Sequence, residues 1–417
     1  MDRVKNQLKK CRLYNFNSRK GIIHLLNIPT NLNLDDIREN MSEFYSFFYL
    51  KKPTKSKKKL SKEEIKNNYL SIDDNLEIYD ERPADYSKDK YRMLINIREK
   101  WLKETLKKIN KLLSLSLIEK NKKEIKYPIS YLHSSLKKRS YTTNVKSHKD
   151  NMYVLAIDLQ AFYPSISYEK IINFFRFDLS LDKDIAEIYT CLCTCPLDDP
   201  KLGNVKYGLG QGLATSPVLA YLTNYRMFEY IYSLAEKNDI DMTVYVDDIV
   251  FSSSKPIDQK FINSLFGIVK KNKLNIKKSK VKLYGPNHMK KITGLCITTG
   301  GVIRVPNSKH FETKIQYDYL TSIILKLNNM NDYFAFYNLF LKFKGNVQFI
   351  ELVEEKVSKK YIDFINEYSI YFEYGIKKNK KSNCYSKENI SLEDYNKMLA
   401  KYELLRKKID STKSKCN

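Results

Sequence analysis

Two adjacent aspartates interrupt an apolar run in which strands are predicted. The segment "TVYVDDIVFSS", Thr243 to Ser253, is β-branched or aromatic on both sides of Asp247 and Asp248. Because the interior of a strand disfavours bare carboxylates, we expect two strands that meet at a tight turn with both acids at its tip. Carboxylates gathered in this way need a cation.

A third aspartate closes another apolar run. In "YVLAIDL", Tyr153 to Leu159, Asp158 follows a stretch of strand-like residues. If this strand pairs beside the one that ends at Val246, Asp158 and Asp247 could bind shared divalent ions. Oxygen-only ligands suit Mg²⁺, and two such ions about 3.5–4 Å apart hold the attacking and leaving oxygens of a phosphoryl transfer. For the acid pair alone, a solvated surface turn is the alternative.

The charge of the chain indicates a polyanionic partner. The formal net charge is +26 over 417 residues, and the excess is spread along the sequence rather than confined to one tail. Nucleic acid is the first candidate, and a solvated basic surface is the alternative. A hydrophobic content of 42% predicts a folded chain rather than a disordered one.

The cysteines indicate reduced thiols in a cytoplasmic protein. Their one cluster, "CLCTC" at 191–195, has alternate spacing that favours a strand over the C-x2-C of a zinc site. The first twenty residues contain no apolar core of a signal peptide, and no uncharged apolar stretch of 18 residues occurs. Neither secretion nor membrane spanning is therefore expected.

Four regions follow one another along the chain. Residues 1–150 are basic and helical in pattern, with a charged loop at 51–68 and a long amphipathic helix over Tyr91–Leu117. Residues 151–306 alternate short apolar strands with helical runs and end in a hairpin around Gly300 and Gly301, which predicts an α+β region.

The last two regions are helical. Residues 307–375 return to a helical pattern, and residues 376–417 hold a polar linker and then a helix. We expect that helix to begin at Ser391, because Ser391 and Asp394 form the S-x-x-D pattern of a capped start.

Three segments in order resemble motifs A, B and C of reverse transcriptases: "AIDLQAFYPSI" from Ala156, "GLGQGLATSPVLAYLTN" from Gly208 and "YVDD" from Tyr245. The resemblance implies a right-hand polymerase with fingers in the first region, an antiparallel palm at 151–306, a helical thumb at 307–375 and a C-terminal extension. It implies an RNA-directed DNA polymerase that uses two Mg²⁺ ions in two-metal nucleotidyl transfer. The implied catalytic and metal-binding positions are Asp158, Leu159, Asp247 and Asp248.

Further matched positions would hold the nucleotide. Tyr163 places a flat ring where the sugar would lie, and in reverse transcriptases a bulky aromatic here excludes the 2′-hydroxyl, so deoxynucleotides are expected. Phe162 either joins it or packs in the core. Gln211 and Gly212 precede a helix and would line the nucleotide and template. The usual L-P-Q-G reads Leu-Gly-Gln-Gly here, with Gly210 in place of proline.

Basic residues complete the implied site. "LNIKKSKVKLY" resembles motif D, and Lys278 would be the general acid for the leaving pyrophosphate, with Lys277 and Lys280 contacting backbone phosphates. Lys138 and Arg139 are candidates for the triphosphate. The segment "KKITGLCI" resembles the primer grip, and "FKGNVQFIELV" resembles the start of a thumb.

Two motifs narrow the class. "RSYTTNVKSH", Arg139 to His148, resembles the retron pattern R-S-I-x-x-N-A-x-x-H, and Ile292–Gly294 resembles the retron triplet V-T-G. Retron enzymes usually carry Y-A-D-D, whereas Val246 stands here. Retron and abortive-infection reverse transcriptases, both implied to act against phage, therefore remain open. His148 could equally be a hydrogen-bonded structural histidine.

The sequence leaves three other functions open. They are a catalytically idle RNA-binding module of the same fold, a group II intron-type reverse transcriptase, and an RNA polymerase of related palm architecture. The expected partners are an RNA template, in such families often a noncoding RNA, the DNA product and deoxynucleotides. The priming group, a homo-oligomer and an effector protein are left open.

Overall fold

The structure is a computed structural model that describes residues 3–39, 41–51, 78–87, 90–120, 124–198, 205–372 and 391–416. The predicted charged loop from residue 52 and the polar linker up to residue 390 lie outside the described residues. Contacts divide the chain into two units, here called the N-terminal unit, through Ile303, and the C-terminal unit, from Arg304. Within the described ranges, no helix is both long and apolar enough to span a membrane.

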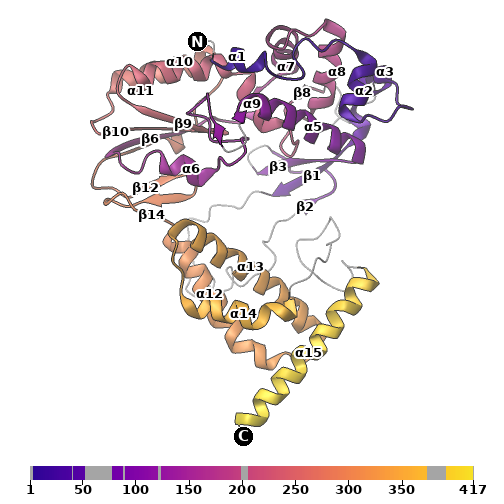
Figure 1. Ribbon diagram of the computed structural model, residues 1–417, viewed down its shortest axis with the longest axis vertical. Coiled ribbons are helices and arrows are strands. Elements are labelled where there is room, and N and C mark those ends of the chain that lie inside the picture. Colours follow the sequence, from indigo (N-terminus) through magenta and orange to yellow (C-terminus); the bar gives the residue numbers. More distant parts are fainter. Residues whose placement is uncertain are drawn as a thin grey trace. The chain divides into compact units, whose positions relative to one another are not determined.

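The N-terminal unit mixes helices with short antiparallel strands, which confirms the α+β prediction (Figure 1). Its helices are α1 (Arg3–Leu8), α2 (Arg19–Leu26), α3 (Leu34–Glu39), α5 (Lys100–Ser116), α6 (Tyr141–Lys146), α7 (Tyr168–Asn173), α8 (Lys183–Cys193), α9 (Ser216–Leu222), α10 (Tyr225–Glu236) and α11 (Gln259–Lys271). Its strands are β1 (Tyr45–Lys51), β2 (Ile78–Tyr79), β3 (Tyr91–Ile97), β4 (Glu119–Lys120), β5 (Ile125–Lys126), β6 (Tyr153–Asp158), β7 (Cys195–Pro196), β8 (Tyr207–Gly208), β9 (Asp241–Tyr245), β10 (Asp248–Ser253), β11 (Lys282–Tyr284), β12 (Lys290–Ile292), β13 (Leu295–Ile297) and β14 (Ile303–Arg304), the last of which reaches the unit boundary.

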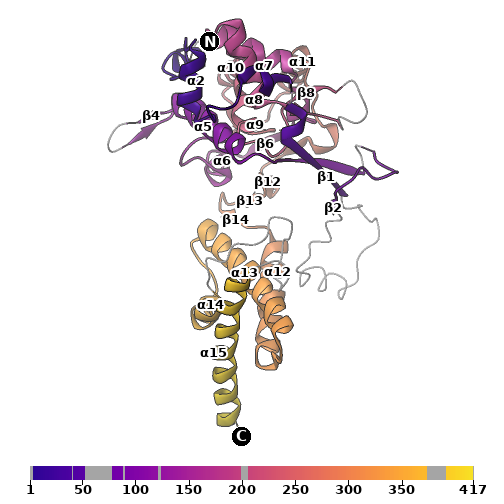
Figure 2. The same ribbon diagram turned by 90° about the vertical axis from the view of Figure 1, so that its right-hand side faces the viewer.

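The sheet that carries the three aspartates has the strand order β11-β6-β10-β9, and every pair in it is antiparallel. Strand β10 is buried almost throughout, as its apolar run predicts. Helices α10 and α11 lie along one side of the sheet, while α6 packs against β9 and β13 (Figures 1 and 2). Helices thus cover one side of the sheet, while the edge strand β11 is exposed.

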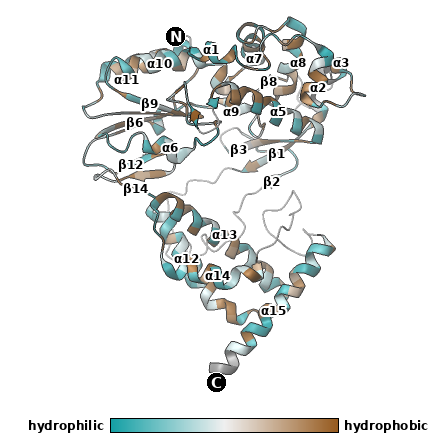
Figure 3. Cartoon of the chain, viewed as in Figure 1, coloured by the Kyte–Doolittle hydropathy of each residue, from teal (hydrophilic) through white to brown (hydrophobic). Residues whose placement is uncertain are grey.

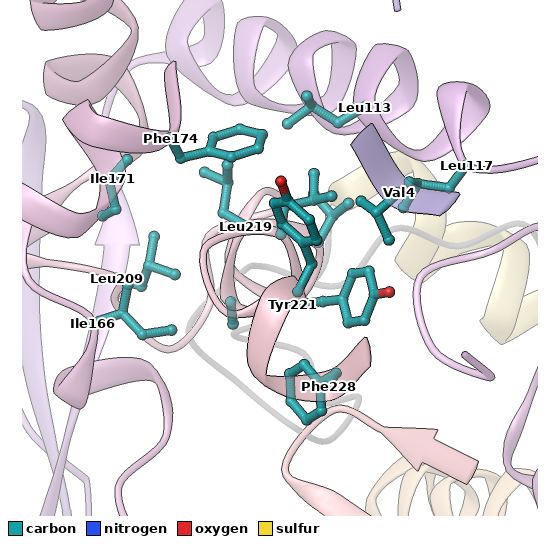
Figure 4. Packing of buried hydrophobic residues seen from close by; sticks show 14 of the residues in the cluster. Val4, Leu113, Leu117, Ile166, Ile171, Phe174, Leu209, Leu219, Tyr221 and Phe228 are labelled. Atoms are coloured by element: carbon teal, nitrogen blue, oxygen red, sulfur yellow. The ribbon is translucent and has the colours of Figure 1, made fainter. Parts of the chain in front are cut away.

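Amphipathic helices supply that cover. In α11 the buried Phe261, Leu265 and Val269 recur every four residues, which places them on one face. The alternating hydrophilic and hydrophobic colours of α10 and α11 in Figure 3 show the same division. Figure 4 shows ten labelled members of the core that these helices help to close, including Leu209, Leu219 and Phe228.

Strands β1 and β3 correct the helical prediction for the first region. The predicted helix over 91–117 is wrong in its first part, because β3 pairs in antiparallel register with β1, from Tyr45 opposite Ile97 to Lys51 opposite Tyr91. The helix α5 begins only at Lys100. A short apolar run fits either a helix or a strand, and the partner strand at least 40 residues earlier decides between them.

The cysteine cluster is also corrected. Cys191 and Cys193 lie in α8 and only Cys195 lies in a strand, so the predicted strand-like alternation is wrong. All three thiols are buried and none of them forms a disulfide, and the same holds for Cys11 and Cys296. Burial in the apolar core raises the pKa of Cys193 and Cys195 to about 12, which makes these thiols poor nucleophiles.

The predicted hairpin at Gly300–Gly301 is confirmed, since β12, β13 and β14 form a second small sheet in this order. The Thr298 amide donates to the Val302 carbonyl at 2.9 Å across the turn, and Gly301 adopts a φ of +75° that a glycine tolerates.

The C-terminal unit is helical, as predicted, with α12 (Asn307–Ile323), α13 (Met330–Glu354), α14 (Lys359–Phe372) and α15 (Leu392–Cys416). Its core is aromatic. The ring of Phe372 lies 5.0 Å from Phe336 and 4.9 Å from Phe340 between centroids. The predicted cap of α15 is confirmed, because the Asp394 amide donates to Ser391 Oγ at 3.1 Å.

His148 ties α6 to the acid-bearing hairpin. Its imidazole is fully buried and lies 2.7 Å from Thr243 Oγ1 on β9 and 2.7 Å from Ser252 Oγ on β10. Burial, with a smaller contribution from His133, lowers the pKa of His148 from 6.5 to about 3, so the ring is neutral. The geometry therefore supports a structural role for His148.

We predict that His148→Leu lowers the free energy of unfolding by about 2–4 kcal/mol, because it removes the imidazole that hydrogen-bonds two buried hydroxyls. The unfolded chain binds the His148 proton more readily, so this histidine makes stability decline as pH falls from 6.5 toward 3. Urea unfolding measured across this pH range should show a shallower decline in the variant. His24→Leu, at an exposed histidine, is the control, and equal behaviour of the two variants would refute the prediction.

Candidate active site

The register of β6 and β10 brings the acids together. Asp158 is the direct cross-strand partner of Asp248, which places their side chains on the same side of the sheet. Asp247 is held beside them, because its carbonyl accepts a hydrogen bond of 2.9 Å from the Leu159 amide. The predicted proximity of Asp158 and Asp247 is therefore what the structure shows.

A strained turn presents Asp247. Strands β9 and β10 pair Tyr245 with Asp248, so Val246 and Asp247 form a two-residue loop. Val246 has a φ of 59°, a left-handed conformation that is costly for a β-branched residue. Positive φ at the first loop position is the pattern of a type II′ hairpin. The predicted tight turn is confirmed, with Asp247 in the loop and Asp248 as the first residue of β10.

The electrostatics of Asp248 report the crowding of negative charge. Burial raises its pKa to about 6, and the charges of Asp247 and Asp158 add to the rise, while Lys280 opposes it. Lys280 Nζ forms an ion pair with Asp158 Oδ2. The pKa of Lys280 is raised by this hydrogen bond first, and the other two carboxylates contribute. Lys280 thus lies within the field of all three acids.

The donor set fits a magnesium ion that keeps other ligands. Three carboxylates supply the hard oxygen that Mg²⁺ prefers, and their mutual repulsion favours a bound cation. In the part of the chain that the structure describes, no three His, Cys, Asp or Glu side chains are arranged to hold an ion by themselves. A Mg²⁺ site usually completes its shell with waters and substrate phosphates, so the two observations agree.

Two aromatic residues follow Asp158, and the ring of one of them, Tyr163, lies near Asp247. Tyr163 and Phe162 are stacked with their centroids 6.2 Å apart, and Phe162 is buried with its edge against Phe228. The pKa of Tyr163 is raised by burial and then by the charges of Asp247 and Tyr245. Phe162 is therefore a core residue that supports the half-buried ring of Tyr163, which lies near Asp247.

The loop that contains Gln211 and Gly212 is closely packed. A Cβ at Gly208 would lie 2.7 Å from the Ile166 carbonyl oxygen, and one at Gly210 would lie 2.3 Å from Cys195 Sγ. Gly212 has a φ of +109°. Gln211 itself is half-buried. Glycine at these positions lets the loop backbone approach its neighbours where a side chain would collide.

The predicted basic residues separate into two groups. Lys278 and Lys277 are exposed, and Lys280 is the lysine that the structure brings to the carboxylates. The role of Lys278 as general acid stays a prediction. From the sequence, Lys280 is expected only to contact a backbone phosphate. Nothing in the local sequence around Lys278 and Lys280 indicates an ion pair with Asp158.

Arg139 has partners outside the group of acids. Its Nη1 donates to the Ser130 carbonyl at 2.9 Å and contacts His133, and its guanidinium lies 4.1 Å from the centre of the Tyr127 ring. Lys138 is exposed and has a left-handed backbone. Triphosphate binding by this pair remains a prediction, and the structure gives Arg139 a packing role.

Similarity to known proteins is consistent with this geometry. The chain is 28% identical over 208 residues to the retron Se72 reverse transcriptase of Salmonella heidelberg (strain 579083-10), covering 48% of this chain and 50% of that protein. It is 30% identical over 164 residues to the retron Ec86 reverse transcriptase of Escherichia coli, covering 39% and 48%. The chain thus spans about half the length of these two curated relatives.

A solved structure of apo telomerase from Candida tropicalis is similar only remotely, at 12% identity and a TM-score of 0.36, covering 64% of this chain and 54% of that one. A likeness at this level says nothing about function.

A family model described as reverse transcriptase (RNA-dependent DNA polymerase) matches residues 80–320. The match includes all three carboxylates, Tyr163 and the Gln211 loop. It covers more than half of the 417 residues, and the chain therefore belongs to the reverse transcriptase family.

Proposed function

We propose that this chain is an RNA-directed DNA polymerase that joins deoxynucleotides by two-metal nucleotidyl transfer. The observation that carries the proposal is the register that sets Asp158 opposite Asp248, with Asp247 at the adjoining turn and Tyr163 beside it. In the right-hand description, the sheet of β6, β9, β10 and β11 is the palm, β1 and β3 belong to the fingers, and α12 to α14 form the thumb.

Each residue has a task that follows from its position. Asp158, Asp247 and Asp248 would hold two Mg²⁺ ions, with Leu159 next to Asp158 as the further predicted ligand. When bound, these ions supply activation of the primer hydroxyl and neutralise the triphosphate. Tyr163 would lie against the sugar, and Gln211 would face the nucleotide and template. Lys278 would protonate the leaving pyrophosphate.

The biological setting is proposed from the relatives. Both curated relatives described above are retron reverse transcriptases, and the two retron-like motifs at 139–148 and 292–294 agree with them. We infer a retron-type enzyme of the cytoplasm that copies a structured noncoding RNA in anti-phage defence. The net charge of +26 suits an RNA template and a DNA product.

We predict that Asp158→Asn and Asp247→Asn each abolish deoxynucleotide incorporation, by about a thousandfold or more, because each change removes a charged metal ligand. Primer extension on an RNA template with Mg²⁺ measures the rate, and filter binding measures RNA affinity, which should stay unchanged. Asp239→Asn, at an exposed acid, is the matched control. Full activity of either ligand variant would refute the proposed function, and RNA binding by an inactive wild type would favour the idle module.

We predict that Tyr163→Ala admits ribonucleotides, because removing the ring opens the space in which a 2′-hydroxyl would otherwise collide. The ratio of kcat/KM for deoxynucleotides to that for ribonucleotides should fall on the order of a hundredfold. Tyr163→Phe keeps the ring and should keep the discrimination. Equal ribonucleotide use by the wild type would instead indicate an RNA polymerase.

We predict that Lys280→Gln tightens metal binding, because the ammonium no longer competes with the ion for Asp158. The affinity for Mn²⁺ without nucleotide, followed by electron paramagnetic resonance, should rise about fivefold, as expected for an ion pair worth about 1 kcal/mol. Lys278→Gln should leave this affinity unchanged and lower kcat. Identical metal affinities in the wild type and in Lys280→Gln would contradict the competition.

A further inference from the structure

The loop before α9 departs from the usual reverse transcriptase pattern at one residue, and the structure gives that residue an unusual neighbour. Gly210 stands where proline is usual. A Cβ there would lie 2.3 Å from Cys195 Sγ and 2.7 Å from Ile95 Cδ1. Real side chains do not make contacts this short. With its present neighbours, the loop therefore requires glycine at position 210.

Cys195 is held in place by burial, strand pairing and a hydrogen bond. It is fully buried, and its strand β7 pairs with β8 so that Cys195 stands opposite Gly208. Its thiol donates to the Gly208 carbonyl at 3.8 Å. The side chain therefore cannot turn away from Gly210 without losing this contact in a closed core.

A hydrogen bond anchors one end of the loop, and the other end passes close to β3. The Gly210 carbonyl accepts a hydrogen bond of 2.7 Å from Ser216 Oγ, at the start of α9. At Gly212 a Cβ would lie 3.1 Å from the carbonyl oxygen of Ile95, a residue of β3. Leu209, which precedes Gly210, is fully buried and belongs to the core shown in Figure 4. Gln211, between Gly210 and Gly212, is the half-buried residue of this segment.

We propose that Cys195 and Gly210 form a size-matched pair. The Cys195 side chain fixes how closely the loop backbone approaches β7, and this distance positions Gln211 toward the nucleotide. Cys195 is a positioning residue, acting through the loop backbone and by its volume. Because its thiol is buried and poorly acidic, no redox chemistry is involved. This inference rests on the proposed polymerase function and adds a determinant of substrate binding to it.

Volume makes the pair separable by mutation. Gly210→Ala alone pushes against Sγ, and the loop has to move. In Cys195→Ala the Sγ is gone, while the Cys195 Cβ would remain 3.9 Å from the new methyl group, an ordinary van der Waals distance. Ile95 Cδ1 is the end of a flexible side chain and can turn aside. The double variant should therefore restore the loop.

The test is a double-mutant cycle of Cys195→Ala and Gly210→Ala in the full-length chain, measured by steady-state primer extension and by urea unfolding. Gly210→Ala should raise the KM for deoxynucleotides about ten- to a hundredfold, as expected when a substrate-positioning group is displaced by about 1 Å. The change in kcat per active site should be smaller. The double variant should return to within a fewfold of the wild-type KM. Gly267→Ala, with no atom near the new Cβ, is the control.

The outcomes separate the two proposals. A rise in KM that Cys195→Ala rescues supports the positioning role. If unfolding shows coupling of the pair while KM stays at the wild-type value, or if KM rises without rescue, the positioning role is overturned and the polymerase function stands. If the wild type incorporates no nucleotide, the proposed function fails, and the positioning role fails with it.

Discussion

The antiparallel register between β6 and β10 is the constraint on which the site depends. It sets Asp158 opposite Asp248, and a shift by one residue would turn one of these carboxylates to the other face of the sheet. The strained turn at Val246 then brings Asp247 next to the pair. Burial and the resulting crowding of charge raise the pKa of Asp248. The pairing of β11 with β6 brings Lys280 to Asp158.

The rest of the N-terminal unit holds that register in place. His148 joins β9 to β10 through two hydrogen bonds of 2.7 Å. Helices α10 and α11 cover one side, so their apolar faces favour a single arrangement of the strands. Around the Gln211 loop, backbone is packed against backbone and against Cys195, which leaves little room for adjustment. Rigid surroundings of this kind suit a site in which charged groups must be preorganised.

Much of the site could be predicted from the sequence, because its signals are local. Carboxylates at the ends of apolar runs, the aromatic pair after Asp158 and the glycines before α9 each stand out over a few residues. The elements that were mispredicted depend on distant partners. Tyr91–Ile97 is a strand because β1 pairs with it, and Cys191–Cys195 crosses from a helix to a strand. A local apolar pattern does not distinguish these alternatives.

By itself the sequence determined the family, the three acids, the tight turn that presents two of them and the excess of positive charge. The tertiary structure alone decided which lysine reaches Asp158, that Arg139 packs on Tyr127, that His148 is a buried link between strands, and that Gly210 has no space for a side chain beside Cys195. The physical reason is that these contacts join different segments of the chain, so their distances are fixed by packing and register rather than by spacing.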